Sequence, residues 1–300
     1  MVKSPVLRSV LVALDLSPMS ARVAARAALL PLADDARLTL LHVLPRLRRT
    51  TLRQGAEEVA RETLETTAAE IAPSLGEKVQ LRSLVTTGSA AKEISKQARA
   101  ARADLVVLGR GGARALRDTF LGSTAERVIR GSQLPVLAVR NPARARYRRP
   151  LLALDLDDAA PQALGVVLRL FPPPRPQLSL VHVYDGSTDL LDAWNPTAEQ
   201  ARECRRLSRE AAIGRIAHLL AICHRLAKGE DVAWSPVVRV GSPREVIPRT
   251  LAKRRADLLV VGTRGRSALA QAFLGTVAGD LLRAVSCDVL VVPPQQAPTP

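Results

Sequence analysis

A glycine pattern occurs twice along this chain of 300 residues, with the same internal spacing. Residues 109–123 read Gly-Arg-Gly-Gly, nine further residues and Gly-Ser, and residues 262–276 read Gly-Thr-Arg-Gly, nine further residues and Gly-Thr. Each copy follows a short apolar run that predicts a strand and precedes a stretch that predicts a helix. Glycine lets backbone N–H groups approach an anion because it has no Cβ. The pattern therefore predicts phosphate recognition at two places, each between a strand and a helix.

The repeat extends beyond these glycines. Leu11–Asp15 returns as Leu151–Asp155, and Leu40–Val43 returns as Leu180–Val183, both shifted by 140 residues. The shift grows to 153 at the glycine pattern, because the second copy has gained 13 residues after its second strand. Two copies of about 145 residues have the usual size of a domain. We expect a first domain over residues 1–143, a second over residues 144–295 and a disordered tail over residues 296–300.

Short apolar runs alternate with longer amphipathic runs in each copy. In the first copy, strands are expected near residues 7–14, 38–44, 79–85, 104–108 and 135–139, and helices near 18–32, 51–72, 89–101 and 122–132. Apolar strands that alternate with helices predict a parallel sheet covered on both faces. This is a doubly wound α/β fold, in which ligands bind at the carboxyl ends of the strands. Asp15 and Gly109 both stand at such ends.

The composition limits the compartment and the partners. The sequence contains no apolar stretch of about 20 residues and no secretion signal, so we expect a cytoplasmic protein with no membrane contact. Three cysteines without paired spacing agree with a reducing compartment. The net charge of +16 lies mostly in residues 1–149, where 26 Lys and Arg face 13 Asp and Glu. Aromatic residues make up only 2% of the chain, and nucleic-acid modules commonly use stacking aromatics. We therefore do not expect a nucleic-acid partner.

The glycine pattern, with an aspartate at the end of the first strand, resembles the nucleotide-binding branch of the universal stress protein family. The resemblance covers both copies almost from end to end. It implies two five-stranded, Rossmann-like domains of the adenine nucleotide α-hydrolase type, each of which binds ATP. Whether Mg²⁺ accompanies the ATP is left open. Members of this family pair through their last strands, so Val136–Val139 and Val289–Val292 are expected to pair within the chain as a pseudo-dimer. A homodimer of the whole chain is left open.

The resemblance also implies roles for matching residues. Asp15 would contact ribose or adenine, the backbone of Val43 would meet adenine, and Gly109, Arg110 and Gly112 would line the ribose and the first phosphates. Gly122, Ser123 and Thr124 would hold the outer phosphates at a helix N-terminus. The second site would use Asp155, Val183, Gly262, Thr263, Gly265, Gly275, Thr276 and Val277.

The two sites are not equal in sequence. Asp157 and Asp158 stand where the first copy has Ser17 and Pro18. Two more carboxylates beside a phosphate site would repel the anion or require a divalent metal, although Arg264 and Arg266 could offset them. The glycines have a plainer explanation as tight turns inherited from an ancestor that bound a ligand.

Three classes of function remain open at this point. The first is a non-catalytic ATP-binding stress or signalling module, whose nucleotide state alters the interaction with an unidentified protein partner. The second is a slow ATPase or phosphotransfer protein, and the third is a structural pseudo-dimer with relic sites. We favour the first, because no P-loop and no general base beside Ser123 or Thr276 is evident in the sequence. His42 and His182 occupy matching strand positions, and we favour a structural role for both.

Overall fold

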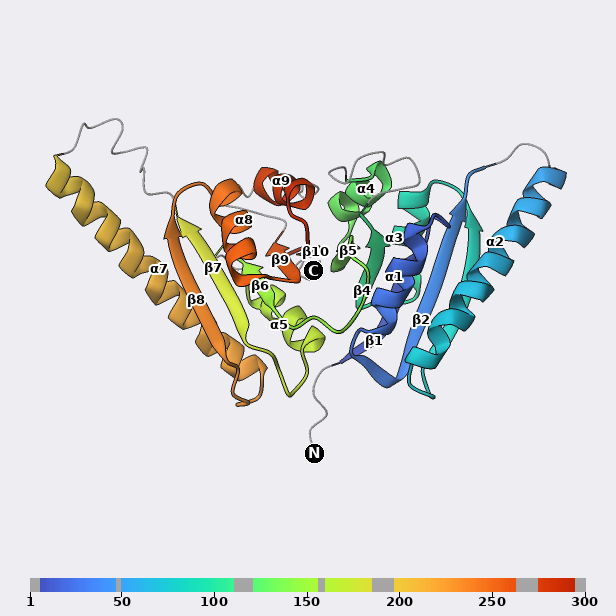
Figure 1. The fold of residues 1–300 in the computed structure, drawn as a ribbon, viewed down its shortest axis with the longest axis horizontal. Helices are drawn as coiled ribbons and strands as arrows, with labels where there is room; N and C mark the ends of the chain where they lie inside the picture. The colour runs from blue at the N-terminus through green and yellow to red at the C-terminus, as the bar shows by residue number, and fades with distance from the viewer. Residues whose placement is uncertain are drawn as a thin grey trace, which may run out of the picture.

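One continuous sheet of ten strands runs through the computed structural model of the protein (Figure 1). The structure describes residues 6–46, 50–110, 121–155, 160–184, 197–262 and 275–294. The expected tail at residues 296–300 lies outside the described residues.

The first repeat consists of β1 (Leu7–Ala13), α1 (Met19–Ala28), β2 (Leu32–Leu44), α2 (Thr50–Ile71), β3 (Gln80–Thr87), α3 (Ala90–Ala100), β4 (Leu105–Gly109), α4 (Ser123–Gly131) and β5 (Val136–Val139). The second consists of β6 (Pro150–Ala153), α5 (Ala160–Leu170), β7 (Leu178–Tyr184), α7 (Ala198–Leu226), β8 (Trp234–Val240), α8 (Pro243–Arg254), β9 (Leu258–Gly262), α9 (Thr276–Ala284) and β10 (Asp288–Val292).

The α/β fold predicted from the sequence is confirmed. Strand pairing is parallel within each half of the sheet, and the strand order is β3-β2-β1-β4-β5-β10-β9-β6-β7-β8. The first expected helix was too long and the second expected strand too short, since α1 ends at Ala28 and β2 starts at Leu32. Pro31 lies between them, and proline disfavours helix at the residue before it.

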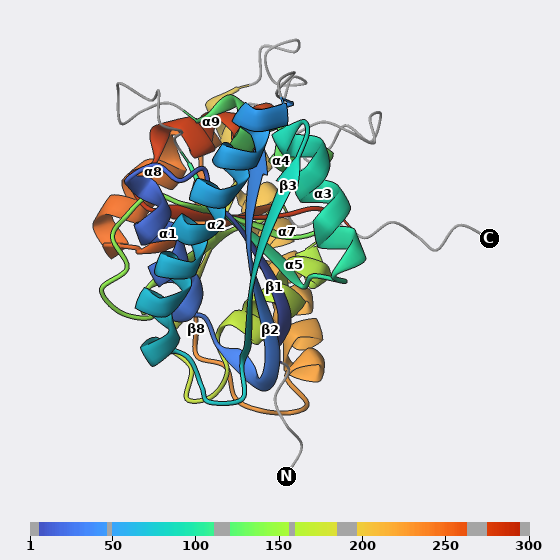
Figure 2. The same cartoon turned by 90° about the vertical axis from the view of Figure 1, so that its right-hand side faces the viewer.

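Helices cover both faces of the sheet. A buried core packs α1, α2, α5 and α7 against one face, and a second core packs α3, α4, α8 and α9 against the other. Figure 2 shows this layering from the side, with α1 and α2 on one side of the strands and α3 on the other. In the described part of the chain no helix has an apolar run long enough to cross a membrane.

The two halves of the sheet join through the last strand of each repeat. β5 and β10 pair antiparallel, with Leu137 opposite Leu290, which confirms the expected pseudo-dimer within the chain. Both leucines are fully buried, so the hydrophobic core continues from one repeat into the other. The molecule is therefore built around a central strand pair that neither repeat can make alone.

A buried polar cluster holds the connection between the repeats against β10. Asp288 accepts hydrogen bonds from the hydroxyl of Tyr147 at 2.6 Å and from the backbone N–H groups of Arg140 and Asn141. Arg26 of α1 adds an ion pair to Asp288 at 3.3 Å and lies over the Tyr147 ring. Each buried charge thus faces a partner, which limits the cost of removing it from water. The connecting segment is fixed in place rather than loosely tethered.

Candidate functional site

The strand register brings the expected adenosine-binding residues of the first repeat to one edge of the sheet. β1 lies between β2 and β4, and Ala13 stands opposite Leu41 on one side and Leu108 on the other. Asp15, two residues further along, is therefore level with Val43 of β2 and with Arg110 just after β4. The chain leaves β1 in opposite directions for β2 and for β4, and this reversal is the switch point where ligands bind in open α/β sheets.

Asp15 is held by one of its carboxylate oxygens. Oδ1 accepts hydrogen bonds from the Ser17 hydroxyl at 2.6 Å, the Ser17 backbone N–H at 3.1 Å and the Ser20 hydroxyl at 3.1 Å. Oδ2 has no hydrogen-bond partner among the described residues, and the side chain is exposed. Leu16 next to it has a φ of 58°, which a branched residue seldom adopts and which is typical of functional sites. This arrangement leaves one oriented oxygen available to a donor such as a ribose hydroxyl.

His42 supports the strand end that carries Asp15. Its Nδ1 donates to the carbonyl of Leu14 at 2.8 Å, and His182 makes the matching bond to Leu154 at 3.2 Å. The two histidines therefore fix the backbone beside the two aspartates, in agreement with the structural role favoured from the sequence.

The α4 helix begins beside this edge without a side-chain cap. Gly122 is the N-cap residue, and its carbonyl accepts the first intrahelical bond, from the N–H of Glu126. The amides of Ser123 and Thr124 come before that first donor, and such amides favour an anion together with the helix dipole. The Gly122 N–H is already used, because it donates to the carbonyl of Arg110 at 2.8 Å. In the first repeat, the described amides that remain available at this helix start therefore begin at Ser123.

Arg110 lies at the site, but its side chain points away from it. The guanidinium is buried and donates to the carbonyl of Val285 at 2.6 Å and to the carbonyl of Arg283 at 3.0 Å, both in the second repeat. Its backbone N–H donates to Val139 at 2.9 Å. Nothing in the sequence indicated this direction, because an arginine in a phosphate-type loop ordinarily suggests contact with the anion.

The second repeat reproduces the same arrangement. Ala153 stands opposite Val181 and Val261, so that Asp155 is level with Val183. The α9 helix also starts uncapped, with Gly275 as N-cap residue and the first intrahelical bond from the N–H of Gly279. The amides of Thr276 and Val277 precede that first bond.

Gly262 ends β9 at this edge. No atom of the described residues lies within 4 Å of a Cβ built on it, and its φ is not positive. Neither packing nor backbone conformation in that part of the chain therefore requires a glycine there.

Some of the expected residues lie outside the described residues: Gly112, Asp157, Asp158, Thr263 and Gly265. The described residues contain no group of three or more His, Cys, Asp or Glu that could hold a metal ion. The repeats also differ in what supports the aspartate, since the hydroxyl of Ser20 is replaced by a methyl group in Ala160. Asp155 consequently lacks one of the donors that orient Asp15.

Comparison with known proteins gives the family. The universal stress protein family matches residues 7–140 and 146–293. A universal stress protein encoded in the QAH/OAS sulfhydrylase 3' region of Thermus aquaticus is 32% identical over 146 residues, which is 49% of this chain and 98% of that protein. A universal stress protein A-like protein of Arabidopsis thaliana is 27% identical over 41% of this chain and 70% of that protein.

Other similarities are partial in sequence or confined to the fold. Universal stress protein E of Escherichia coli strain K12 is 41% identical over 63 residues, which is only 20% of that protein. The crystal structure of a universal stress protein from Archaeoglobus fulgidus DSM 4304 covers 95% of this chain and 96% of its own, at 20% identity and a TM-score of 0.67. The full-length likeness in fold and the two matched segments lead to one conclusion: the chain belongs to the universal stress protein family, with one family domain in each repeat.

Proposed function

We propose that each repeat binds ATP at the carboxyl edge of its half of the sheet, as a non-catalytic stress or signalling module. The adenosine end of the ligand lies between Asp15 and Val43 in the first site, and the outer phosphates lie at Ser123 and Thr124 of α4. Asp155, Val183, Thr276 and Val277 take these places in the second site. A magnesium ion bound to the phosphates is compatible with this arrangement, because the protein then need not supply its ligands.

One observation carries the proposal. An exposed aspartate at a strand end and an uncapped helix N-terminus led by glycine occur together at the same edge, and they do so in both repeats. A carboxylate accepts hydrogen bonds from hydroxyl or amino groups, whereas a helix N-terminus binds an anion. A nucleotide carries hydroxyl and amino donors at its adenosine end and an anion at its phosphate end.

The signalling part of the proposal rests on the family and on the position of the sites. A ligand at this edge contacts the starts of α4 and α9, both of which are partly exposed. Occupation of the sites therefore changes a surface that a protein partner can read. In this role ATP acts as a ligand that is bound and released.

The test is calorimetric titration of the whole chain with ATP, together with mass spectrometry of any nucleotide that co-purifies. Gly122→Val places a branched side chain at the start of α4, and we expect it to weaken binding at the first site by about tenfold or more, which corresponds to about 1.4 kcal/mol. Gly275→Val does the same at the second site. Gly131→Val at the other end of α4 is the matched control, because no described atom lies within 4 Å of its added Cβ. Equal affinities in Gly122→Val and Gly131→Val, with the second site disabled in both, would contradict the proposal.

A further inference from the structure

Arg110 connects the first candidate site with the second repeat. Its carbonyl accepts the N–H of Gly122 at the start of α4, whereas its guanidinium reaches the carbonyls of Arg283 and Val285 at the end of α9. It is 2% exposed. A single buried residue therefore touches the N-terminal end of one phosphate-type helix and the C-terminal end of the other.

Arg110 contacts α9 through buried hydrogen bonds whose donor is charged. Burial, followed by the nearby charge of Arg140, lowers the pKa of Arg110 to about 10, so the guanidinium remains charged at neutral pH. Hydrogen bonds from a charged donor are shorter and stronger than neutral ones, and the C-terminal end of a helix favours a cation. Arg140 donates to the same Val285 carbonyl at 2.8 Å. The end of α9 is consequently held by two cations of the first repeat.

The α9 helix carries this contact to the second candidate site. It has nine residues and begins at Thr276, where the outer phosphates of the second ligand would lie. At a rise of 1.5 Å per residue its ends are about 13 Å apart. Because a short α-helix keeps its internal hydrogen bonds, fixing its last turn also restricts its first turn.

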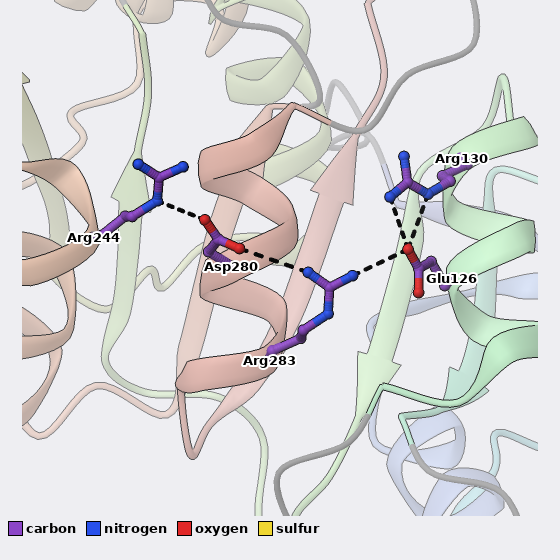
Figure 3. A network of polar contacts seen from close by, with 5 residues as sticks. All are labelled: Glu126, Arg130, Arg244, Asp280 and Arg283. Carbon is purple, nitrogen blue, oxygen red and sulfur yellow. Dashed lines mark hydrogen bonds and ion pairs between the residues drawn. The ribbon is translucent and has the colours of Figure 1, made fainter.

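A second connection between the same helices lies at the surface, as Figure 3 shows. Arg283 of α9 pairs with Glu126 of α4 at 3.1 Å, and Arg130 pairs with the same carboxylate at 2.7 Å. The hydrogen bond from Arg130, with Arg283 as a further cation, lowers the pKa of Glu126. Exposed ion pairs contribute little because water screens them. This pair therefore offers a control for the buried contact.

The second repeat has no arginine to return the contact. Thr263 stands at the position that matches Arg110, and Pro293 at the position that matches Arg140. Within the described residues the buried bridge is therefore built from the first repeat, although a coupling between two binding sites is reciprocal in free energy whatever its construction.

We propose that Arg110 couples the two nucleotide sites, so that a ligand in the first site restrains α9 and thereby tightens binding at the second. This inference rests on the proposed function. A ligand at Ser123 and Thr124 orders the start of α4 and, through Gly122, the backbone of Arg110. The second ligand then meets a helix that is already restrained, and it loses less conformational entropy on binding. The coupling is therefore positive.

Hydrogen exchange in the whole chain tests this coupling. In Gly275→Val the second site is weakened, so an ATP concentration that fills the first site and leaves the second largely empty lets α4 report binding and α9 report the coupling. We expect ATP to slow amide exchange in both helices. When Arg110→Lys is added, one ammonium group replaces the planar fork that reaches two carbonyls. We expect the protection of α9, relative to that of α4, to fall at least about fivefold, a size typical of coupling between sites.

Arg283→Gln in the same background is the matched control. It removes the exposed pair with Glu126 but keeps the main-chain carbonyl that Arg110 uses, and we expect the ratio of α9 to α4 protection to be retained. Protection of α4 without protection of α9 would overturn the coupling and leave ATP binding intact. Loss of the ratio in Arg283→Gln but not in Arg110→Lys would overturn the role of Arg110. Absence of protection in both helices would refute the proposed ATP binding, and the coupling with it.

The Gly275→Val arm tests the coupling even where Arg110→Lys does not fold, because it needs no change at Arg110, and loss of the ratio in Arg283→Gln would then still contradict a path through Arg110. Calorimetry adds a second measurement on the wild-type chain. Positive coupling predicts that ATP binds the first site at least about fivefold more tightly with the second site filled than in Gly275→Val. Two independent sites with the affinities of the single-site variants would contradict it.

Discussion

Single side chains decide how the candidate sites and the centre of the molecule behave. Asp15 is exposed and oriented by two serine hydroxyls, whereas Tyr147 is buried and oriented by Asp288. In the proposed function the first side chain meets the ligand, whereas the second holds the connection between the repeats. Their substitutions should therefore affect different measurements.

Removal of the Asp15 carboxylate should weaken ATP and ADP equally. The lost acceptor belongs to the adenosine end of the site and leaves a ribose hydroxyl or amino group unpaired, at a cost of about 1–3 kcal/mol. Calorimetric titration of Asp15→Ala with both nucleotides measures this loss. Asp35→Ala, which removes an exposed carboxylate from the other end of β2, is the control and should bind as the wild type does. A loss confined to ATP would show that Asp15 acts through the γ-phosphate or its metal.

Tyr147 should make the protein sensitive to alkali. Burial first, and then the charge of Asp288, raise the pKa of Tyr147 well above its ordinary value of 10.0. A pKa raised in the folded state means that its contribution to stability is complete below about pH 10 and declines above it, by at most about 1.4 kcal/mol per pH unit. Urea unfolding of Tyr147→Phe between pH 8 and pH 11, compared with the wild type, isolates this contribution from other groups. An unchanged pH dependence in the variant would contradict the assignment.

Helix starts and strand ends set the chemistry at the scale of elements. The α4 and α9 helices begin in the same way, but the strands beside them end differently, because Ser17 and Ser20 of the first repeat correspond to Asp157 and Ala160 of the second. The first repeat thus surrounds its aspartate with hydroxyl donors, whereas the second has a further carboxylate two residues after its aspartate in the sequence.

The second site should bind ATP more weakly than the first and depend more on magnesium. Two like charges about 5 Å apart repel by about 3 kcal/mol at an effective dielectric constant of 20, and a divalent cation between them reverses the sign. Asp157→Ser should reduce the magnesium dependence, and the reciprocal Ser17→Asp should create one at the first site. Titrations of Gly122→Val and Gly275→Val with and without chelator give each site separately. Equal metal responses at the two sites would mean that Asp157 points away from the ligand.

These elements could be predicted because a parallel sheet produces a regular hydrophobic pattern in the sequence. Apolar strands alternate with amphipathic helices, and all carboxyl ends within a half-sheet meet at one edge, so Asp15 and Gly109 could be placed together without coordinates. The direction of Arg110 could not be predicted, because it depends on the carbonyls at the end of a helix some 170 residues away. Asp288 offered a weak signal, since a carboxylate beside an apolar strand needs a partner. Its partner Tyr147 stands in a segment that reads only as a basic linker.

The whole molecule depends on the β5–β10 pair. Residues 1–149 contain a complete first repeat but leave β5 as a short, fully apolar edge. Exposed strand edges of this kind pair with another chain. The arrangement makes each repeat the completing partner of the other.

The first repeat expressed alone should therefore form a homodimer. We expect residues 1–149 to associate through β5 in the way that β5 meets β10, because the pair is antiparallel and joins equivalent strands. Light scattering on a sizing column measures the mass, with the full chain run beside it under the same conditions. A stable monomer of residues 1–149 would show that the pair with β10 is dispensable.

The distance along the chain between β5 and β10 also has a consequence for biosynthesis. About 150 residues separate the two strands, and at 5–20 residues per second a ribosome needs roughly 8–30 s to cover them. The first repeat can assemble its other four strands during that time. The apolar edge of β5 stays unpaired until β10 has been translated. Nascent chains on neighbouring ribosomes expose the same unpaired β5 edge to one another. Pairing of β5 with β10 in the same chain therefore competes with pairing of β5 between two unfinished chains. Slower translation of the second half favours the pairing between chains.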